Sequence, residues 1–148
     1  KIDSHIVFMG FGELHSLIIE NENSFENIHF HPAVRHDRVV ELCANADYGL
    51  CLIENISLSD FYCLPNKLFE YIFSGTPVLS SEFPEIEKLI NEYEIGTTCD
   101  VTSLSSIENA IIEMSKNSYK FSVSELQELS WENQEYKLVN CYESFYFR

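Results

Sequence analysis

Short apolar runs alternate along the chain with segments whose apolar residues recur every three or four positions. The runs predict short strands, at residues 5–9, 28–31, 48–53 and 97–101 and directly after Gly75. The continuous run 48–53 predicts a strand that is buried on both faces. The segments with helical spacing predict helices, at residues 13–20, 33–46, 65–74, 103–116 and from 84 onward. Because strands that alternate with helices are typical of a parallel sheet, we expect an α/β fold with helices flanking the sheet.

The stretch 64–84 has the clearest boundaries. Pro65 suits the first position of a helix, where its missing N–H has no intrahelical partner, and Gly75 can adopt the left-handed conformation that ends one. On this helix the residues predicted to pack inward are Leu68, Phe69, Ile72 and Phe73. The residues predicted on the opposite, chemically active side are Lys67, Glu70, Tyr71 and Ser74.

Lys67 and Glu70 have two interpretations. Three residues apart on a helix, they can form an ordinary surface ion pair, which contributes about 0.2–0.5 kcal/mol. Alternatively, the free N–H groups and positive dipole end of the helix bind an anion beside Lys67, and Glu70 accepts hydrogen bonds from a ribose diol. The helix lies between two predicted parallel strands, which places its start at the ligand-binding carboxyl edge of the sheet.

The segments 64–71 and 74–78 resemble the donor-binding motif of retaining glycosyltransferases with the GT-B fold, namely glycosyltransferase family 4 and its relatives. The family's motif has a Glu before the helix, a second Glu inside it, and then a small residue, Gly, Thr or Lys, Pro and Val. Further segments resemble the family's C-terminal half in the expected order, at residues 8–12, 27–34, 44–47 and 131. The resemblance implies a Rossmann-like parallel sheet flanked by helices, the C-terminal half of a GT-B architecture, with closing C-terminal helices.

The resemblance also implies roles for particular residues. Its nucleotide-sugar-binding positions correspond here to Val34, Leu64, Asn66, Lys67 and Glu70. Val34 flanks the base, Lys67 supports the diphosphate, and Glu70 holds the ribose.

One position departs from the family's motif. Tyr62 stands where the family has its first, sugar-contacting Glu. Asp60 is the candidate to replace that carboxylate, so Asp60 and Tyr62 are possible sugar contacts. The resemblance identifies no catalytic residue.

The resemblance implies a single nucleotide-sugar-binding domain over residues 1–148, in which residues 119–148 form closing helices. It implies a fragment that lacks the first strand and helix of this domain and the N-terminal, acceptor-binding half. The intact enzyme is expected to transfer a sugar from a UDP-sugar or GDP-sugar to an acceptor hydroxyl in surface-polysaccharide synthesis, with retention at the anomeric carbon. The fragment alone is expected to be inactive.

The same resemblance implies no cofactor and no metal, since the helix end and cations stabilise the departing diphosphate. The expected partners are the nucleotide sugar, the N-terminal half, and a glycan or lipid-linked sugar as acceptor. The expected location is the cytoplasm or the cytosolic face of the membrane. Two rival functions remain, a sugar-nucleotide epimerase of the same architecture and a non-catalytic interaction domain, and Tyr62 favours the second.

Composition narrows the classes of partner. The 148 residues carry a formal net charge of −15 with only nine Lys and Arg, which argues against nucleic-acid and anionic-membrane surfaces. Residues 1–148 contain no apolar run of about 18 residues and no signal-peptide pattern, so we expect no membrane span in this segment. The five cysteines are widely spaced among mostly apolar residues, which is typical of reduced, buried thiols in a cytosolic protein.

Other patterns give weaker candidates. Gly10 and Gly12 begin a dinucleotide-type glycine pattern, but His15 replaces its third glycine, which disfavours an NAD site. His29 and His31 share a strand face without an evident third metal ligand. Arg35 and Arg38 have two interpretations: they attract the diphosphate, or they lie in the solvent-exposed first turn of a helix. Two segments, 55–63 and 80–82, are expected at the carboxyl ends of strands. In the first segment, the possible sugar contacts include Asn55, Ser57 and Ser59.

Overall fold

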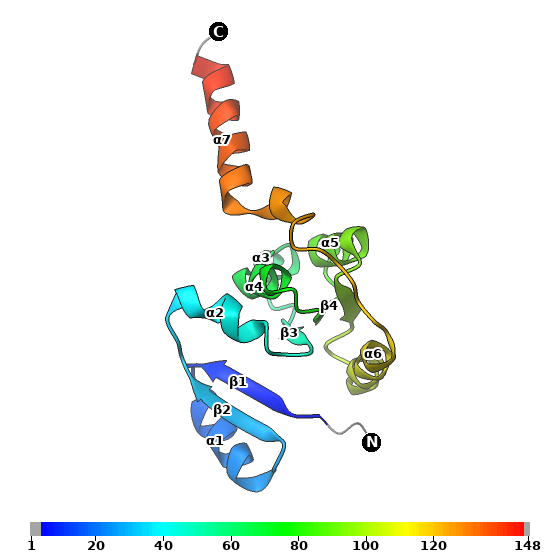
Figure 1. Cartoon of the computed structure of the whole chain (residues 1–148). Helices are drawn as coiled ribbons and strands as arrows, with labels where there is room; N and C mark the ends of the chain where they lie inside the picture. The colour runs from blue at the N-terminus through cyan, green and yellow to red at the C-terminus, as the bar shows by residue number, and fades with distance from the viewer. Residues whose placement is uncertain (1–3, 147–148) are drawn as a thin grey trace. The chain divides into compact units, whose positions relative to one another are not determined.

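The first part of the chain forms a two-stranded parallel sheet with one helix beside it (Figure 1). In the computed structural model, which describes residues 4–146, its elements are β1 (Ile6–Gly10), α1 (His15–Ser24) and β2 (Ile28–Pro32). The register runs from Ile6 opposite Ile28 to Gly10 opposite Pro32. These elements belong to the first of two compact units, residues 1–39 and 40–148. The single-domain organisation stays a prediction.

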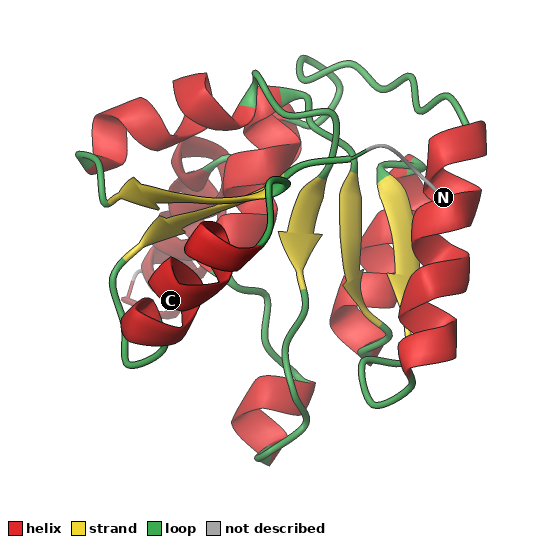
Figure 2. Cartoon of the chain, turned by 90° about the horizontal axis from the view of Figure 1, so that it is seen from below, coloured by secondary structure: helices red, strands yellow, loops and turns green. Residues whose placement is uncertain are grey.

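The second unit contains a three-stranded parallel sheet in the order β3-β4-β5. Its elements, after α2 (His36–Cys43) at the boundary between the units, are β3 (Gly49–Cys51), α3 (Leu58–Phe61), α4 (Asn66–Ser74), β4 (Val78–Ser81), α5 (Pro84–Tyr93), β5 (Gly96–Cys99), α6 (Leu104–Lys116), the 3-10 turn η1 (Gln127–Leu129) and α7 (Trp131–Tyr146). Helices connect consecutive parallel strands (Figure 2). The α/β, Rossmann-like fold is therefore confirmed, with parallel sheets flanked by helices.

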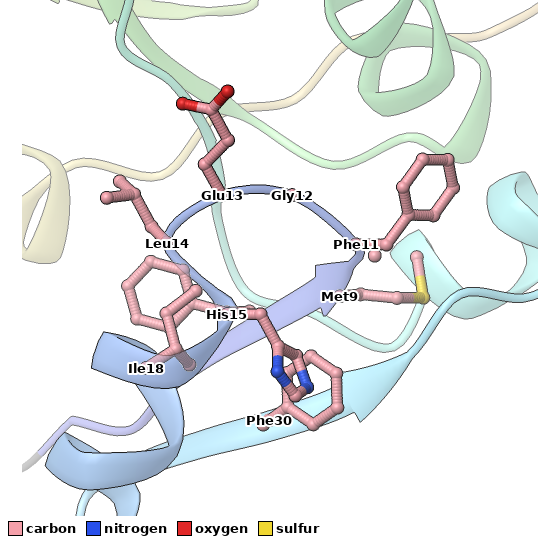
Figure 3. Close-up of a pocket in the computed structure, with 10 residues that line it drawn as sticks. Met9, Phe11, Gly12, Glu13, Leu14, His15, Ile18 and Phe30 are labelled. Atoms are coloured by element: carbon pink, nitrogen blue, oxygen red, sulfur yellow. The ribbon is translucent and has the colours of Figure 1, made fainter.

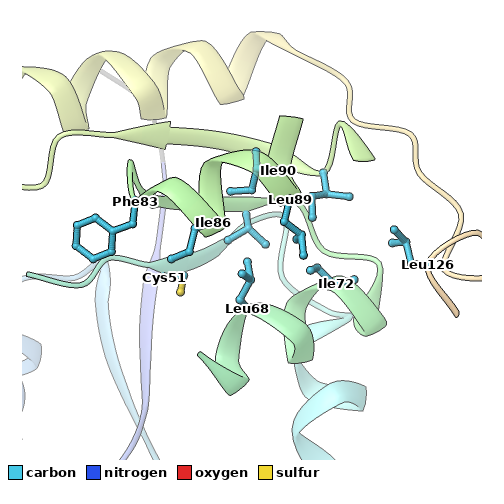
Figure 4. Packing of buried hydrophobic residues seen from close by; sticks show 10 residues of the cluster. Cys51, Leu68, Ile72, Phe83, Ile86, Leu89, Ile90 and Leu126 are labelled. Atoms are coloured by element: carbon cyan, nitrogen blue, oxygen red, sulfur yellow. The ribbon is translucent and has the colours of Figure 1, made fainter. Parts of the chain in front are cut away.

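Two hydrophobic clusters cover the two faces of the β3-β4-β5 sheet. Successive residues of a strand point to opposite faces, and on β4 Val78 joins one cluster and Leu79 the other. The first cluster contains the inward residues of α4 and α5 (Figure 4), and the second contains Ala110 and Met114 of α6. The sheet is thus packed between α4 and α5 on one side and α6 on the other.

Local sequence sets the ends of α4 and α5. Gly75 has φ of 76°, and it ends α4 in the left-handed conformation as predicted. Pro65 lies one residue earlier than expected: it is the N-cap, with ψ of 150°, and the helix begins at Asn66. A residue with this extended ψ cannot itself be helical. Pro84 does occupy the first turn of α5.

Several boundaries differ from the predicted ones. β3 covers only three residues of the apolar run 48–53, and α2 ends at Cys43 instead of extending to residue 46. The short helix α3 lies inside the segment predicted to be a loop, where Ser57 Oγ accepts a hydrogen bond from the N–H of Asp60 over 3.2 Å and caps the helix. Four residues are too few for an apolar periodicity to reveal them.

The chain between α6 and α7 returns to the core of the second unit. Leu126 is 1% exposed and joins the cluster that contains Ile72 (Figure 4). The hydroxyl of Tyr93 in α5 donates a hydrogen bond to Glu128 in η1, and this bond raises the pKa of Tyr93 to about 12. The buried side chain of Leu126 and the Tyr93–Glu128 hydrogen bond therefore hold the segment before α7 against the core of the second unit.

The closing helices carry an apolar stripe, and the described residues leave most of it exposed. Its exposed members on α7 are Trp131, Leu138, Val139, Tyr142 and Phe145. Leu126 and Leu129, which precede α7, are buried and half-buried respectively. Residues 147 and 148 of the predicted closing helices lie outside the described residues.

Candidate functional site

The start of α4 lies at the carboxyl edge of the β3-β4-β5 sheet. α4 follows β3 and precedes β4, and these two strands are parallel, so the helix runs against them and begins where β3 ends. The N–H groups of the first helical residues have no partner inside the helix. The N–H of Leu68 bonds to the carbonyl of Pro65 over 3.0 Å. The earlier N–H groups, those of Asn66 and Lys67, are the ones available to an anion.

The predicted side chains of this turn are accessible. Asn66 and Lys67 are exposed, and Leu64 is 41% exposed. Burial raises the pKa of the Cys51 thiol in β3, and a hydrogen bond with Ser80 and the positive charge of Lys67 oppose that rise in part. The ammonium of Lys67 is open to solvent at the start of α4.

Glu70 lies one turn further along α4 and is half-buried. Burial raises the pKa of the Cys43 thiol, and the nearby charge of Glu70 raises it further. The same carboxylate contributes to the raised pKa of Tyr71, which burial dominates. Glu70 is therefore near Cys43 at the end of α2, and its ribose role stays a prediction.

Tyr71 is not on a chemically active face. A Cβ at Gly49 would overlap its ring, so the ring lies flat against the backbone at the start of β3. The prediction for Tyr71 is wrong. Helical spacing alone indicates that the side chain faces solvent, but Gly49 has no side chain and leaves room for the ring to pack on β3. Of the predicted outward set, Lys67 is exposed, whereas Glu70 and Ser74 are half-buried.

Asp60 and Tyr62 lie just before this turn, in and after α3. Asp60 Oδ2 accepts a hydrogen bond of 2.7 Å from Ser57 Oγ, so the carboxylate helps to cap its own helix. Tyr62 is 58% exposed, and its ring meets the edge of Phe61 at a centroid distance of 5.0 Å. Both residues belong to the segment between β3 and α4, and their sugar contacts stay predictions.

Val34 lies in the first unit, in the turn between β2 and α2, and is half-buried there. The structure therefore groups Leu64, Asn66, Lys67 and Glu70 on one helix and its approach, whereas Val34 belongs to the other unit. Arg35 forms a 2.6 Å ion pair with Asp37, which fits the solvated helix start.

One hollow of the described residues belongs to the first unit. It has a volume of about 340 Å³ and lies at the Gly10–Gly12 turn and the start of α1 (Figure 3). Its wall is mostly apolar, with Glu13 and His15 as its charged or polar side chains, and the rings of His15 and Phe30 meet edge to face at a centroid distance of 4.7 Å. Such a wall offers no set of polar groups for a diphosphate.

A second hollow, of about 170 Å³, lies in the second unit. It is lined by the last residues of β4 and β5 and by residues that follow all three strands, namely Asn55, Phe61, Ser81, Glu82, Phe83, Cys99, Asp100, Val101 and Thr102. Neither hollow is lined by Lys67 or Glu70. The sequence indicated Glu82 only by its place after a strand, and Asp100 was missed because it was assigned to the strand itself.

The thiols and possible metal ligands add little to the site. The five cysteines are free; Cys51 and Cys99 are buried as expected, whereas Cys141 is exposed. Within residues 4–146, no group of three or more His, Cys, Asp and Glu side chains could hold a metal ion. No helix in the same range is long and apolar enough to cross a bilayer.

Residues 5–138 match the family described as glucosyltransferase 3-like, C-terminal domain. No protein with a curated description matches the chain significantly. The match extends over both sheets, α4 and most of the closing segment. The chain therefore belongs to the family of glucosyltransferase 3-like C-terminal domains, and this supports its assignment to a glycosyltransferase.

Proposed function

We propose that this chain is the donor-binding domain of a retaining glycosyltransferase with the GT-B architecture. The observation that carries the proposal is the position of α4, whose N-terminus lies at the carboxyl edge of a parallel sheet with Lys67 in its first turn and Glu70 one turn further. Open α/β sheets bind ligands at this edge. The ligand is a nucleoside diphosphate sugar with uridine or guanosine as its base.

Each group has a defined task in this proposal. The N–H groups of Asn66 and Lys67 and the Lys67 ammonium bind the diphosphate. They stabilise the negative charge that develops as the sugar leaves. Glu70 accepts hydrogen bonds from the ribose hydroxyls, and Val34 flanks the base. With a formal net charge of −15, the chain needs this local positive charge to hold an anionic donor.

In the intact enzyme, an N-terminal half supplies the acceptor site. The reaction transfers the sugar to an acceptor hydroxyl, on a glycan or a lipid-linked sugar, with retention at the anomeric carbon. We place this reaction in the synthesis of surface polysaccharide, in the cytoplasm or at the cytosolic face of the membrane. The reaction needs no metal, because the helix end and the cations neutralise the leaving group.

Calorimetric titration of the chain with UDP, GDP and their sugars tests the binding proposal. We expect one nucleotide to bind, and Lys67→Met and Glu70→Gln each to weaken it by about tenfold or more, since hydrogen bonds to charged groups contribute about 1.5–3 kcal/mol. Lys88→Met and Glu87→Gln on α5, where both side chains are exposed, are matched controls. Circular dichroism confirms that each variant is folded.

Two outcomes would contradict the proposal in different ways. Unchanged affinity in Glu70→Gln would remove the ribose role of that residue. No heat from any nucleotide at millimolar concentration, with the chain folded, would favour the non-catalytic interaction domain. The exposed Tyr62 at the position of the family's first Glu is the observation that supports this second candidate.

A further inference from the structure

The last residue of β4, Ser81, is hydrogen-bonded to a residue that lies beyond the end of β3. The register of the two strands ends with Cys51 opposite Ser80, so Ile53 lies outside the ladder. The N–H of Ile53 donates to Ser81 Oγ over 2.6 Å, and the Ser81 hydroxyl donates to the carbonyl of Ile53 over 2.8 Å. One side chain therefore pairs both backbone groups of a residue that has left the sheet.

The surroundings of Ser81 make these two bonds a firm constraint. Ser81 is fully buried, and Ile53 is half-buried and packs against the first hydrophobic cluster. A buried backbone N–H or C=O that loses its partner costs the desolvation of that group. Because the Ser81 hydroxyl is shielded from water, it fixes the point at which the chain leaves β3.

Ile53 precedes the segment that leads to the proposed donor site. Residues 54–64 connect it to the approach and first turn of α4, which carries Lys67. α4 itself is fixed by the buried residues on its inner side. The path of 54–64 needs contacts of its own, because most residues of this segment are exposed.

Hydrogen bonds inside the segment shape α3. The N–H of Phe61 donates to the carbonyl of Ser57 over 3.0 Å, and the N–H of Cys63 donates to the carbonyl of Asp60 over 3.3 Å. These bonds join residues of 54–64 to one another. They do not attach the segment to the sheet.

The end of β4 attaches the segment at two points. Ser81 holds the chain at Ile53, and the ring of Phe61 lies against that of Phe83 with a centroid distance of 5.5 Å. The N–H of Phe83 donates a hydrogen bond of 2.8 Å to the carbonyl of Ser81, so both points belong to one local structure. The polar attachment depends on a single hydroxyl group.

We propose that Ser81 is a positioning residue for the donor site. Its hydroxyl keeps 54–64 on a path that leaves the first turn of α4 open to the diphosphate. The inference rests on the proposed function, since it gives a residue outside the nucleotide contacts a part in arranging that site. Without the hydroxyl, the segment samples other paths, and only a fraction of the molecules presents an open turn. Affinity for the nucleotide then falls in proportion to that fraction.

The test compares Ser81→Ala with Ser80→Ala in the full chain. The two serines are adjacent on β4 and equally buried, and the Ser80 hydroxyl donates to the carbonyl of Cys51, inside the ladder, over 2.9 Å. Each substitution therefore removes one buried hydroxyl from the same strand, but only Ser81→Ala releases Ile53. Circular dichroism confirms that both variants are folded.

NMR-detected amide exchange measures the attachment directly. In Ser81→Ala we expect the Ile53 amide to exchange about tenfold faster, the ratio that corresponds to the loss of one typical hydrogen bond. We also expect the Ile53 amide proton, which is held in a 2.6 Å bond, to move to higher field. The protected amides of 54–64 should exchange faster as well. In Ser80→Ala all these signals should keep their protection.

Titration with UDP and GDP, in separate arms, measures the effect on the donor site. We expect the nucleotide that binds the unmodified chain to bind Ser81→Ala about three- to tenfold more weakly and to bind Ser80→Ala equally well. Ser81→Thr keeps the hydroxyl and should restore both the affinity and the protection of Ile53. If Ser81→Ala does not fold, Ser81→Cys, whose thiol is a weaker donor and acceptor, should show the same changes to a smaller degree.

Three results would overturn the proposal. The first is an unchanged nucleotide affinity in Ser81→Ala, and the second is an equal loss of affinity in Ser80→Ala. The third is an Ile53 amide that stays as protected in Ser81→Ala as in the unmodified chain. If neither nucleotide binds the unmodified chain, the proposed function is contradicted instead, and the exchange comparison still shows whether Ser81 holds the segment.

Discussion

At Gly96 the chain has no space for a side chain. A Cβ there would overlap the carbonyl of Val78, its partner in the β4-β5 register, and backbone cannot move aside as a flexible side chain can. Gly49 is similar, because the ring of Tyr71 covers it. Both glycines are needed for close approach, since neither has a positive φ.

Gly96→Ala should therefore lower the free energy of unfolding by about 1–3 kcal/mol through overpacking. Gly12→Ala, where a Cβ would meet nothing within 4 Å, is the control and should change stability little. Urea unfolding followed by circular dichroism measures both. Equal midpoints for the two variants would show that β4 and β5 do not approach as described.

The sequence predicts some of the candidate binding residues better than others. Lys67 and Glu70 could be predicted because they lie on one helix, whose periodicity and boundaries are local properties. Val34 could be named only through resemblance, since an isolated valine has no chemistry of its own. Asp100 could not be found, because nothing in its neighbourhood indicates that Glu82 lies close by.

Among the elements, α4 is specified mostly by its own residues, whereas the segment around η1 depends on distant partners. Leu126 is buried against residues of α4 and α5. The hydrogen bond between Tyr93 and Glu128 joins the same two regions. The segment after α6 thus contributes Leu126 to the core, although this residue lies outside any helix or strand.

Leu126→Ala should destabilise the second unit by about 2–5 kcal/mol, because it leaves a cavity among packed side chains. Leu138→Ala is the matched control: its side chain on α7 is 52% exposed and should cost little. Thermal unfolding of the two variants measures the difference. A small effect at Leu126 would indicate that the segment does not dock on α5.

On the scale of the molecule, the two units differ in how much they bury. Within residues 4–39 no side chain is fully buried, and the sheet has two strands. The second unit has two clusters on the two faces of its sheet. Isolated two-stranded sheets are marginally stable, whereas a sheet packed between helices is stable by itself.

Amide hydrogen exchange of the chain should therefore be slowest in β4 and fast in β1 and β2, after correction for intrinsic rates. β4 is the central strand, and all its residues are buried. NMR-detected exchange measures each strand separately. Equal protection in β1 and β4 would show that the first unit is stabilised by more than its own contacts.

The sequence by itself determined the α/β class, the order of the elements, the ends of α4 and the residues of its exposed turn. These properties depend on periodicity and on the local conformations of proline and glycine, which neighbouring residues suffice to express. Only the tertiary structure decided that Tyr71 packs on Gly49, that Leu126 reaches the core, and that Glu82 and Asp100 share a hollow. Each of these depends on packing between elements, which brings together residues that are distant in the sequence.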